Sequence, residues 1–212
     1  MIECVIFDFG NTLADEQWMM QSPPDLPTWE LAYRHGVWNR PKEWGDPWSR
    51  GELTAYDVAE RMHNVLGIST SRAYQIMLGN SRKLRFYPNV MSFVRTRRQQ
   101  GLKQAIVTIN ADIFSDVVVP HYRLDMQFDV IINSCDYGSL DKVELSKHVF
   151  AHYGGGIGFH NTLLIDNSKT HLERFTEHGG KTYLFTNDTQ FQEDLLRGSL
   201  TCIKHKFVVA SG

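Results

Sequence analysis

The sequence predicts an α/β protein with a doubly wound parallel sheet and a helical domain inserted after the first strand. Residues 2–9 are rich in β-branched and aromatic types with little polar interruption, which is typical of a strand buried on both faces. After residue 88, segments of helical and of strand character alternate, as in a chain of right-handed crossovers. Between these parts the strand pattern disappears, and all five tryptophans and six of the seven prolines lie within residues 1–88.

This difference in composition predicts the domain boundaries. We expect an α/β core built from residues 1–14 and 88–212, and a helical cap domain formed by residues 15–87. One helix in the cap is well marked: Thr54 is a candidate N-cap, Asp57 stands in the capping-box position, and Gly67 is a candidate stop. A repeating apolar pattern predicts its buried face, made of Leu53, Tyr56, Ala59, Met62 and Leu66.

The later strands are expected where short apolar runs follow helical segments. These runs are residues 102–108, 128–132, 162–166 and 182–185, with an edge strand expected at 201–209.

Composition and charge exclude several classes of function. The formal net charge of −2 gives no long-range field that would attract nucleic acid, and no apolar run is long enough to span a membrane. Three widely separated cysteines, Cys4, Cys135 and Cys202, favour reduced thiols over a disulfide framework or a zinc site. We therefore expect a cytoplasmic protein with no nucleic-acid or membrane partner; the sequence indicates no oligomeric state.

Polar residues at the ends of the predicted strands are the strongest candidates for a site, because parallel sheets bind ligands beyond the carboxyl ends of their strands. Asp8 ends the first strand and Thr108 the second, Lys142 follows the third, and Asp166 ends the fourth. A nucleophilic carboxylate, a hydroxyl and an ammonium to bind an oxyanion, and a second acid for a divalent cation suit phosphoryl transfer.

The motifs that carry these residues resemble those of the haloacid dehalogenase (HAD) superfamily, in the same order. Phe7 to Leu13 (FDFGNTL) resembles the first motif, and Ile106 to Thr108 (IVT) the second. The stretch from Ser134 to Gly138 (SCDYG), followed by Lys142, is similar to the third, and Leu164 to Ser168 (LIDNS) to the fourth. The resemblance covers nearly the whole chain and implies a Rossmann-like, HAD-type core with a C1-type helical cap.

The resemblance also implies a function and a set of roles. It implies a magnesium-dependent phosphatase that acts on a small phosphorylated metabolite through an aspartyl-phosphate on Asp8. Lys142 and the segment Thr108, Ile109 and Asn110 would bind the phosphate, with Lys147 as the alternative lysine. The metal ligands would be Asp8, the carbonyl of Gly10, and Asp166 or Asn167.

Two positions depart from the pattern of the phosphatase members. Gly10 stands where these members commonly carry an aspartate that serves as general acid and base, and Asn167 stands in place of a second acid. We expect reduced activity, weaker magnesium binding, and a preference for aryl or acyl phosphates, whose leaving groups need no proton.

Two alternatives remain open from the sequence. A dehalogenase that hydrolyses a small haloacid also needs no proton for its leaving group, although retention of Asp166 argues against it. A catalytically weak or silent HAD-fold protein would bind a phosphorylated ligand or a partner instead. In the cap, we expect some tryptophan rings to line the pocket and the others to pack the helices together. Four basic residues either contact an anionic substrate or lie on a solvent-exposed face of the cap: Arg34, Arg40, Lys42 and Arg50.

Overall fold

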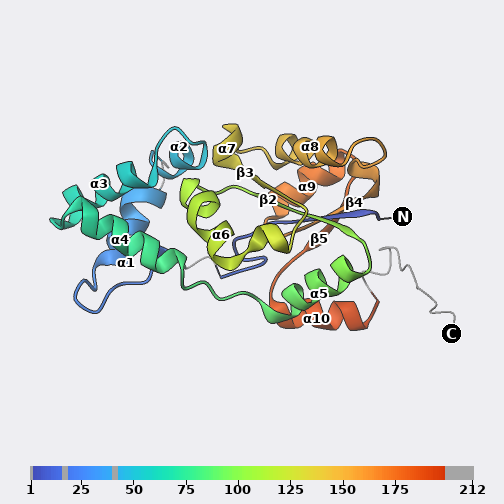
Figure 1. Ribbon diagram of the computed structural model, residues 1–212, viewed down its shortest axis with the longest axis horizontal. Coiled ribbons are helices and arrows are strands. Elements are labelled where there is room, and N and C mark those ends of the chain that lie inside the picture. The colour runs from blue at the N-terminus through green and yellow to red at the C-terminus, as the bar shows by residue number, and fades with distance from the viewer. Residues whose placement is uncertain (1, 16–18, 40–42, 199–212) are drawn as a thin grey trace.

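The computed structural model describes residues 2–15, 19–39 and 43–198 (Figure 1). Trp18, Arg40, Lys42, Cys202 and the edge strand expected at 201–209 lie outside the described residues.

A five-stranded parallel sheet in the order β3-β2-β1-β4-β5 forms the core, which confirms the predicted fold class. The central strand pairs with two neighbours, so that Phe7 lies opposite Ile106 on one side and Ile165 on the other. The strands are β1 (Cys4–Phe7), β2 (Lys103–Thr108), β3 (Val130–Asn133), β4 (Thr162–Asp166) and β5 (Lys181–Leu184).

The apolar run at the start of the chain is explained by burial on both faces of the sheet. Along β1, Val5 and Phe7 belong to one hydrophobic cluster, whereas Cys4 and Ile6 belong to the other. The strand is shorter than predicted, and Asp8 follows it directly, with its N–H donating to the carbonyl of Ile165 at 2.9 Å.

Helices cover both faces of this sheet, as a doubly wound fold requires. In Figure 1, α8 (Lys142–Tyr153) and α9 (Lys169–Glu177) lie above the sheet, and α5 (Pro88–Gln99) and α10 (Asp188–Leu196) lie below it. The shorter elements are η3 (Phe114–Val118), α6 (Val119–Tyr122), η4 (Leu124–Met126), α7 (Ser134–Tyr137) and η5 (Phe159–Asn161). No helix in the described part of the chain is both long and apolar enough to cross a membrane.

Residues 19–39 and 43–81, here called the helical insert, contain helices and no strand among their described positions. In Figure 1 the insert lies at the end of the molecule opposite the N-terminus. It shares one hydrophobic cluster with the lower face of the sheet, and that cluster includes Phe9, Trp48 and Met62. The domain boundaries at 14/15 and 87/88 stay a prediction. The insert comprises α1 (Trp29–Tyr33), η2 (Arg34–Trp38), α2 (Gly45–Ser49), α3 (Ala55–Leu66) and α4 (Thr70–Ser81).

Helix α3 confirms the predicted capping signals but differs in its buried face. Thr54 and Asp57 form a capping box, and Gly67 ends the helix with a left-handed φ of 67°. The expectation that Tyr56 is buried was wrong: it is 58% exposed, and its ring lies 6.2 Å from that of Tyr74 on α4. The fully buried side of α3 is formed by Val58, Ala59 and Met62.

Candidate active site

The sheet brings Asp8, Lys142 and Asp166 into direct contact. Asp8 and Asp166 lie at the carboxyl ends of the adjacent strands β1 and β4, and Lys142 is the first residue of α8, whose N-cap is Asp141. The Nζ atom of Lys142 lies 2.7 Å from Oδ1 of Asp8 and 2.6 Å from Oδ2 of Asp166. The lysine is 3% exposed, so its ammonium is a buried charge held between two carboxylates.

The three groups shift one another's protonation equilibria. Burial raises the pKa of Asp8 above its usual value, as does the charge of Asp166, and Lys142 opposes both effects. Burial also acts to raise the pKa of Asp166, but Lys142, a hydrogen bond from His171 and the N–H of Ser168 outweigh it and lower the pKa to about 2. For Lys142, burial acts to lower the pKa, and the two carboxylates outweigh it and raise the pKa. The ammonium is therefore retained at neutral pH.

Of the two candidate lysines, the structure places Lys142 at the site. Lys147, five residues further along α8, is exposed and pairs with Glu144 at 2.7 Å on the outer side of the helix. An exposed ion pair of this kind contributes little to stability, and its lysine does not contact Asp8 or Asp166.

Thr108 and Asn110 form the other polar part of the site, at the end of β2. The side-chain amide of Asn110 donates to Oγ1 of Thr108 at 2.9 Å, and its backbone N–H donates to Oγ of Ser134 at 2.9 Å. The segment that follows β2 is therefore fixed by hydrogen bonds on both sides of Asn110.

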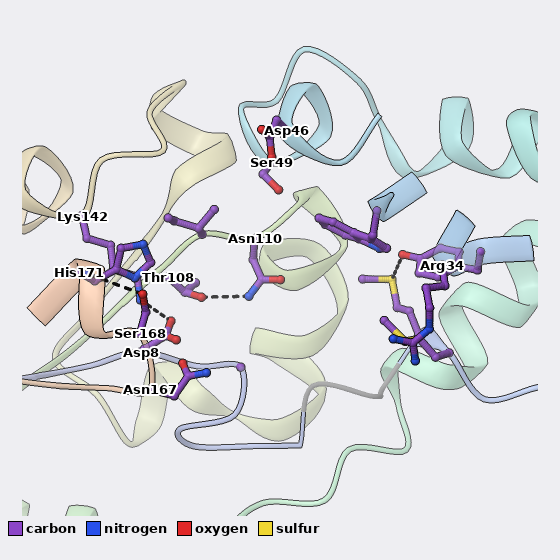
Figure 2. A pocket seen from close by; sticks show the side chains of 16 residues that line it. Asp8, Arg34, Asp46, Ser49, Thr108, Asn110, Lys142, Asn167, Ser168 and His171 are labelled. Atoms are coloured by element: carbon purple, nitrogen blue, oxygen red, sulfur yellow. Dashed lines mark hydrogen bonds and ion pairs between the residues drawn. The ribbon is translucent and has the colours of Figure 1, made fainter. Parts of the chain in front are cut away.

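A cavity of about 490 Å³ opens between these strand ends and the helical insert. In Figure 2 the labelled groups Asp8, Lys142, Thr108 and Asn167 gather at one end, and Arg34 lies at the other. The lining residues are Asp8, Gly10, Met19, Met20, Tyr33, Arg34, Trp38, Asp46, Ser49, Thr108, Ile109, Asn110, Lys142, Asn167, Ser168 and His171.

Apart from Asp166 and the alternative lysine Lys147, every residue predicted for the site lines this cavity. The carboxylate of Asp166 is fully buried: Oδ1 accepts from the N–H of Ser168 at 2.7 Å, and Oδ2 contacts Lys142 and Nδ1 of His171. Asn167, by contrast, is exposed at the cavity. Of the two alternatives for a metal ligand in the fourth motif, Asn167 is the one whose position suits the role.

The cavity end of the site carries one carboxylate, from Asp8, together with Gly10 and the amide of Asn167. Among the described residues, no group of three or more His, Cys, Asp and Glu side chains is arranged to hold a metal ion. Mg²⁺ is commonly bound by one or two carboxylates together with substrate phosphates, so this oxygen set fits Mg²⁺ bound together with a phosphate.

Several cavity residues were not predicted from the sequence. His171 lies on α9, one turn after the N-cap Ser168, and no local pattern distinguishes it from a surface histidine. The insert contributes Met19, Met20, Tyr33 and Asp46, which only the folded chain brings near Asp8. Of the tryptophans described, Trp38 alone lines the cavity, whereas Trp29 and Trp48 are fully buried.

The basic residues of the insert differ in the same way. Arg34 lines the cavity and also pairs with Glu30 at 3.0 Å, whereas Arg50 is not among the lining residues and pairs with Glu52.

Similarity to known proteins is found in three-dimensional structure: the sequence matches no family model and no curated protein. A predicted HAD-like family hydrolase of Porphyromonas gingivalis is similar with a TM-score of 0.68 and 15% identity, over 93% of this chain and 97% of that one. A HAD family enzyme of Bacteroides thetaiotaomicron, solved as a magnesium complex, gives 0.65 and 16%, over 92% and 98%. The L-2-haloacid dehalogenase of Xanthobacter autotrophicus gives 0.64 and 20%, over 93% and 84%. The five-stranded parallel sheet, the helical insert and these similarities together show that the chain has the haloacid dehalogenase-like fold.

Proposed function

We propose that the protein is a hydrolase, a phosphatase that acts on a small phosphorylated metabolite through an aspartyl-phosphate on Asp8. The observation that carries this proposal is the buried ammonium of Lys142, which joins the carboxylates of Asp8 and Asp166 at one end of the cavity. An ion pair that binds Asp8 in a fixed orientation, next to a hydroxyl and an amide, suits attack on a phosphoryl group.

Each residue has a definite part in the proposed reaction. A carboxylate oxygen of Asp8 attacks phosphorus, the bond from phosphorus to the leaving-group oxygen breaks, and the leaving group takes the electron pair. Lys142 and the hydroxyl of Thr108 bind the phosphoryl oxygens as negative charge builds on them. Water then attacks phosphorus, the bond from phosphorus to the Asp8 oxygen breaks, and the carboxylate of Asp8 is restored while the released phosphate carries the protons of the water. Mg²⁺ held by Asp8, the Gly10 carbonyl and Asn167 would offset the charge that a phosphate brings next to a carboxylate.

Gly10 directs the choice of substrate within this proposal. A positioned acid or base contributes about 10²- to 10⁴-fold in rate, and Gly10 offers no carboxyl at the position that the phosphatase pattern uses. We therefore propose aryl or acyl phosphates, whose leaving groups depart without a proton.

Steady-state kinetics on p-nitrophenyl phosphate and on an alkyl phosphate test this choice. We expect a higher kcat/KM for the aryl ester, and a gain in alkyl phosphate turnover in Gly10→Asp. Equal values for the two esters, with no gain in the variant, would contradict the assignment.

A dehalogenase is the second candidate, because the similarity to the Xanthobacter enzyme is of the same order and a halide leaves without a proton. Isotope labelling separates the two reactions. In a single turnover in H₂¹⁸O, a phosphatase places ¹⁸O in the released phosphate, because water attacks phosphorus. A dehalogenase forms an alkyl ester of Asp8, whose hydrolysis at the carboxyl carbon places ¹⁸O in Asp8 itself.

If neither a phosphate ester nor a haloacid is turned over, with or without Mg²⁺, both enzymatic candidates are rejected. Binding of phosphate without turnover, in an activity screen where Asp8→Asn makes no difference, would then favour a ligand-binding protein.

A further inference from the structure

The hydroxyl of Ser134 joins the helical insert to the loop that follows β2. Ser134 is the first residue of α7 and is fully buried. Its Oγ atom lies 2.6 Å from the carbonyl oxygen of Ser49, at the end of α2, and 2.9 Å from the backbone nitrogen of Asn110. The carbonyl of Asn110 is farther away, at 3.1 Å. Because a hydroxyl has a single proton, the shortest contact indicates that Ser134 donates to Ser49 and accepts from Asn110.

The hydrogen bonds continue from Asn110 to the candidate phosphate-binding residue Thr108. The side-chain amide of Asn110 donates to Oγ1 of Thr108 at 2.9 Å, and Figure 2 shows both side chains at the cavity. With Oγ1 engaged as an acceptor, the hydroxyl proton of Thr108 is left to donate to a ligand oxygen. One chain of hydrogen bonds therefore runs from Ser49 in the insert to the hydroxyl of Thr108.

A second attachment seats the same part of the insert on the same loop. Oδ1 of Asp112 accepts from Nε1 of Trp48 at 2.7 Å, and Oδ2 accepts from the N–H of Ala55 at 2.8 Å. Between Trp48 and Ala55 in the sequence, Gly51 approaches the backbone so closely that a Cβ there would clash with the carbonyl oxygen of Cys135. Residues 48–55 are thus packed against the segments that follow β2 and β3.

We propose that Ser134 is a positioning residue that couples the seating of residues 48–55 to the orientation of Asn110 and Thr108. Ser134 is not a lining residue of the cavity, so it acts on a ligand through Asn110. When the insert is seated, the hydroxyl of Thr108 is oriented to bind a phosphoryl oxygen. When the insert moves, the hydroxyl of Ser134 loses its acceptor on Ser49 and turns to the carbonyl of Asn110, so that Asn110 and Thr108 lose their fixed orientation. The identity of the ligand rests on the proposed function, whereas the coupling itself does not.

Hydrogen exchange in the absence of substrate tests the coupling directly. The variant is Ser134→Ala, and the matched control is Ser81→Ala. This control removes another fully buried hydroxyl, whose one partner among the described residues is the carbonyl of Met77 within α4. We expect the backbone amide of Asn110 and the indole N–H of Trp48 to exchange about tenfold faster in Ser134→Ala, and neither to change in the control. Faster exchange at Asn110 with an unchanged Trp48 indole would overturn the proposal, because Ser134 would then hold the loop alone.

A double-mutant cycle on p-nitrophenyl phosphate hydrolysis tests the route through Asn110. We expect Ser134→Ala to lower kcat/KM about tenfold in the otherwise unchanged protein, and to have little further effect in Asn110→Ala. The same fall in both backgrounds would show that Ser134 does not act through the Asn110 side chain and would overturn this route. If the unchanged protein has no turnover, the proposed function fails, and hydrogen exchange still decides the coupling.

Discussion

Replacing Lys142 by methionine is the perturbation whose effect follows most directly from the structure. The change keeps a side chain of similar length but removes a 3% exposed ammonium that lies 2.7 Å from Asp8 and 2.6 Å from Asp166. Two carboxylates, with exposed side-chain fractions of 12% and 0%, would then face each other without a buried counter-ion.

The magnitude is set by the cost of an uncompensated buried charge. Breaking a buried ion pair by removing one partner costs about 3–5 kcal/mol. Asp166 keeps its contacts with His171 and the N–H of Ser168, and a proton can neutralise one of the acids, so the lower part of this range applies. We expect Lys142→Met to lose about 3 kcal/mol of unfolding free energy at pH 7, a large part of a typical total of about 5–15 kcal/mol.

Urea unfolding followed by circular dichroism measures this loss, and the same helix offers a control. Lys147→Met removes an exposed ammonium paired with Glu144, and we expect a change within about 0.5 kcal/mol. Adding Asp166→Asn to Lys142→Met removes one of the facing charges and should recover part of the loss. If Lys142→Met is as stable as Lys147→Met, the buried ion pair does not hold the site together and the reasoning is wrong.

Two further predictions concern the elements around the site. In urea unfolding, Gly51→Ala should destabilise the protein by about 1–3 kcal/mol more than Gly67→Ala. Both glycines have φ near 70°, but only at Gly51 would a Cβ press against the carbonyl of Cys135. Equal losses of stability would show that this contact relaxes. Asp141→Ala should cost about 1 kcal/mol at pH 7, because Asp141 caps α8 and pairs with Arg174. Burial acts to raise the pKa of Asp141, but Arg174 and the backbone N–H groups of Val143 and Glu144 outweigh burial, so the pKa lies below its usual value of about 3.9. The cost of the substitution should therefore be full above that value and vanish as the pH falls through the lowered pKa, and a cost independent of pH would contradict the role of the carboxylate.

The parts of the fold that sequence patterns predict are those with local causes. The strand β1 is predictable because burial on both faces leaves no polar residue within it. Helix α3 is predictable because Thr54 and Gly67 cap its two ends. The periodic pattern predicts the wrong position for Tyr56, because an aromatic ring at the exposed edge between α3 and α4 has the same spacing as a buried one.

The site was predictable as far as strand ends define it. Asp8, Thr108 and Asp166 follow or end strands that pair with defined register, so their proximity follows from topology. The sequence favours Lys142 with Lys147 as the alternative, because the direction of each side chain depends on where α8 begins. Asp141 caps the helix, so that Lys142 is its first residue and lies at the site.

Contacts between distant segments of the chain place His171 and the residues of the insert at the cavity. Their positions depend on how the helices pack, which no local pattern encodes. The hydrogen bond between Ser134 and Ser49 joins residues 85 positions apart and is of the same kind.

The central claim is that Asp8 is the nucleophile, and covalent trapping tests it most directly. The unchanged protein and Asp8→Asn would each be mixed with p-nitrophenyl phosphate and Mg²⁺, quenched in acid within a single turnover, digested, and analysed by mass spectrometry. We predict one phosphoryl group on the peptide that contains Asp8 in the unchanged protein, and neither this adduct nor turnover in Asp8→Asn. Turnover that continues undiminished in Asp8→Asn would contradict the account.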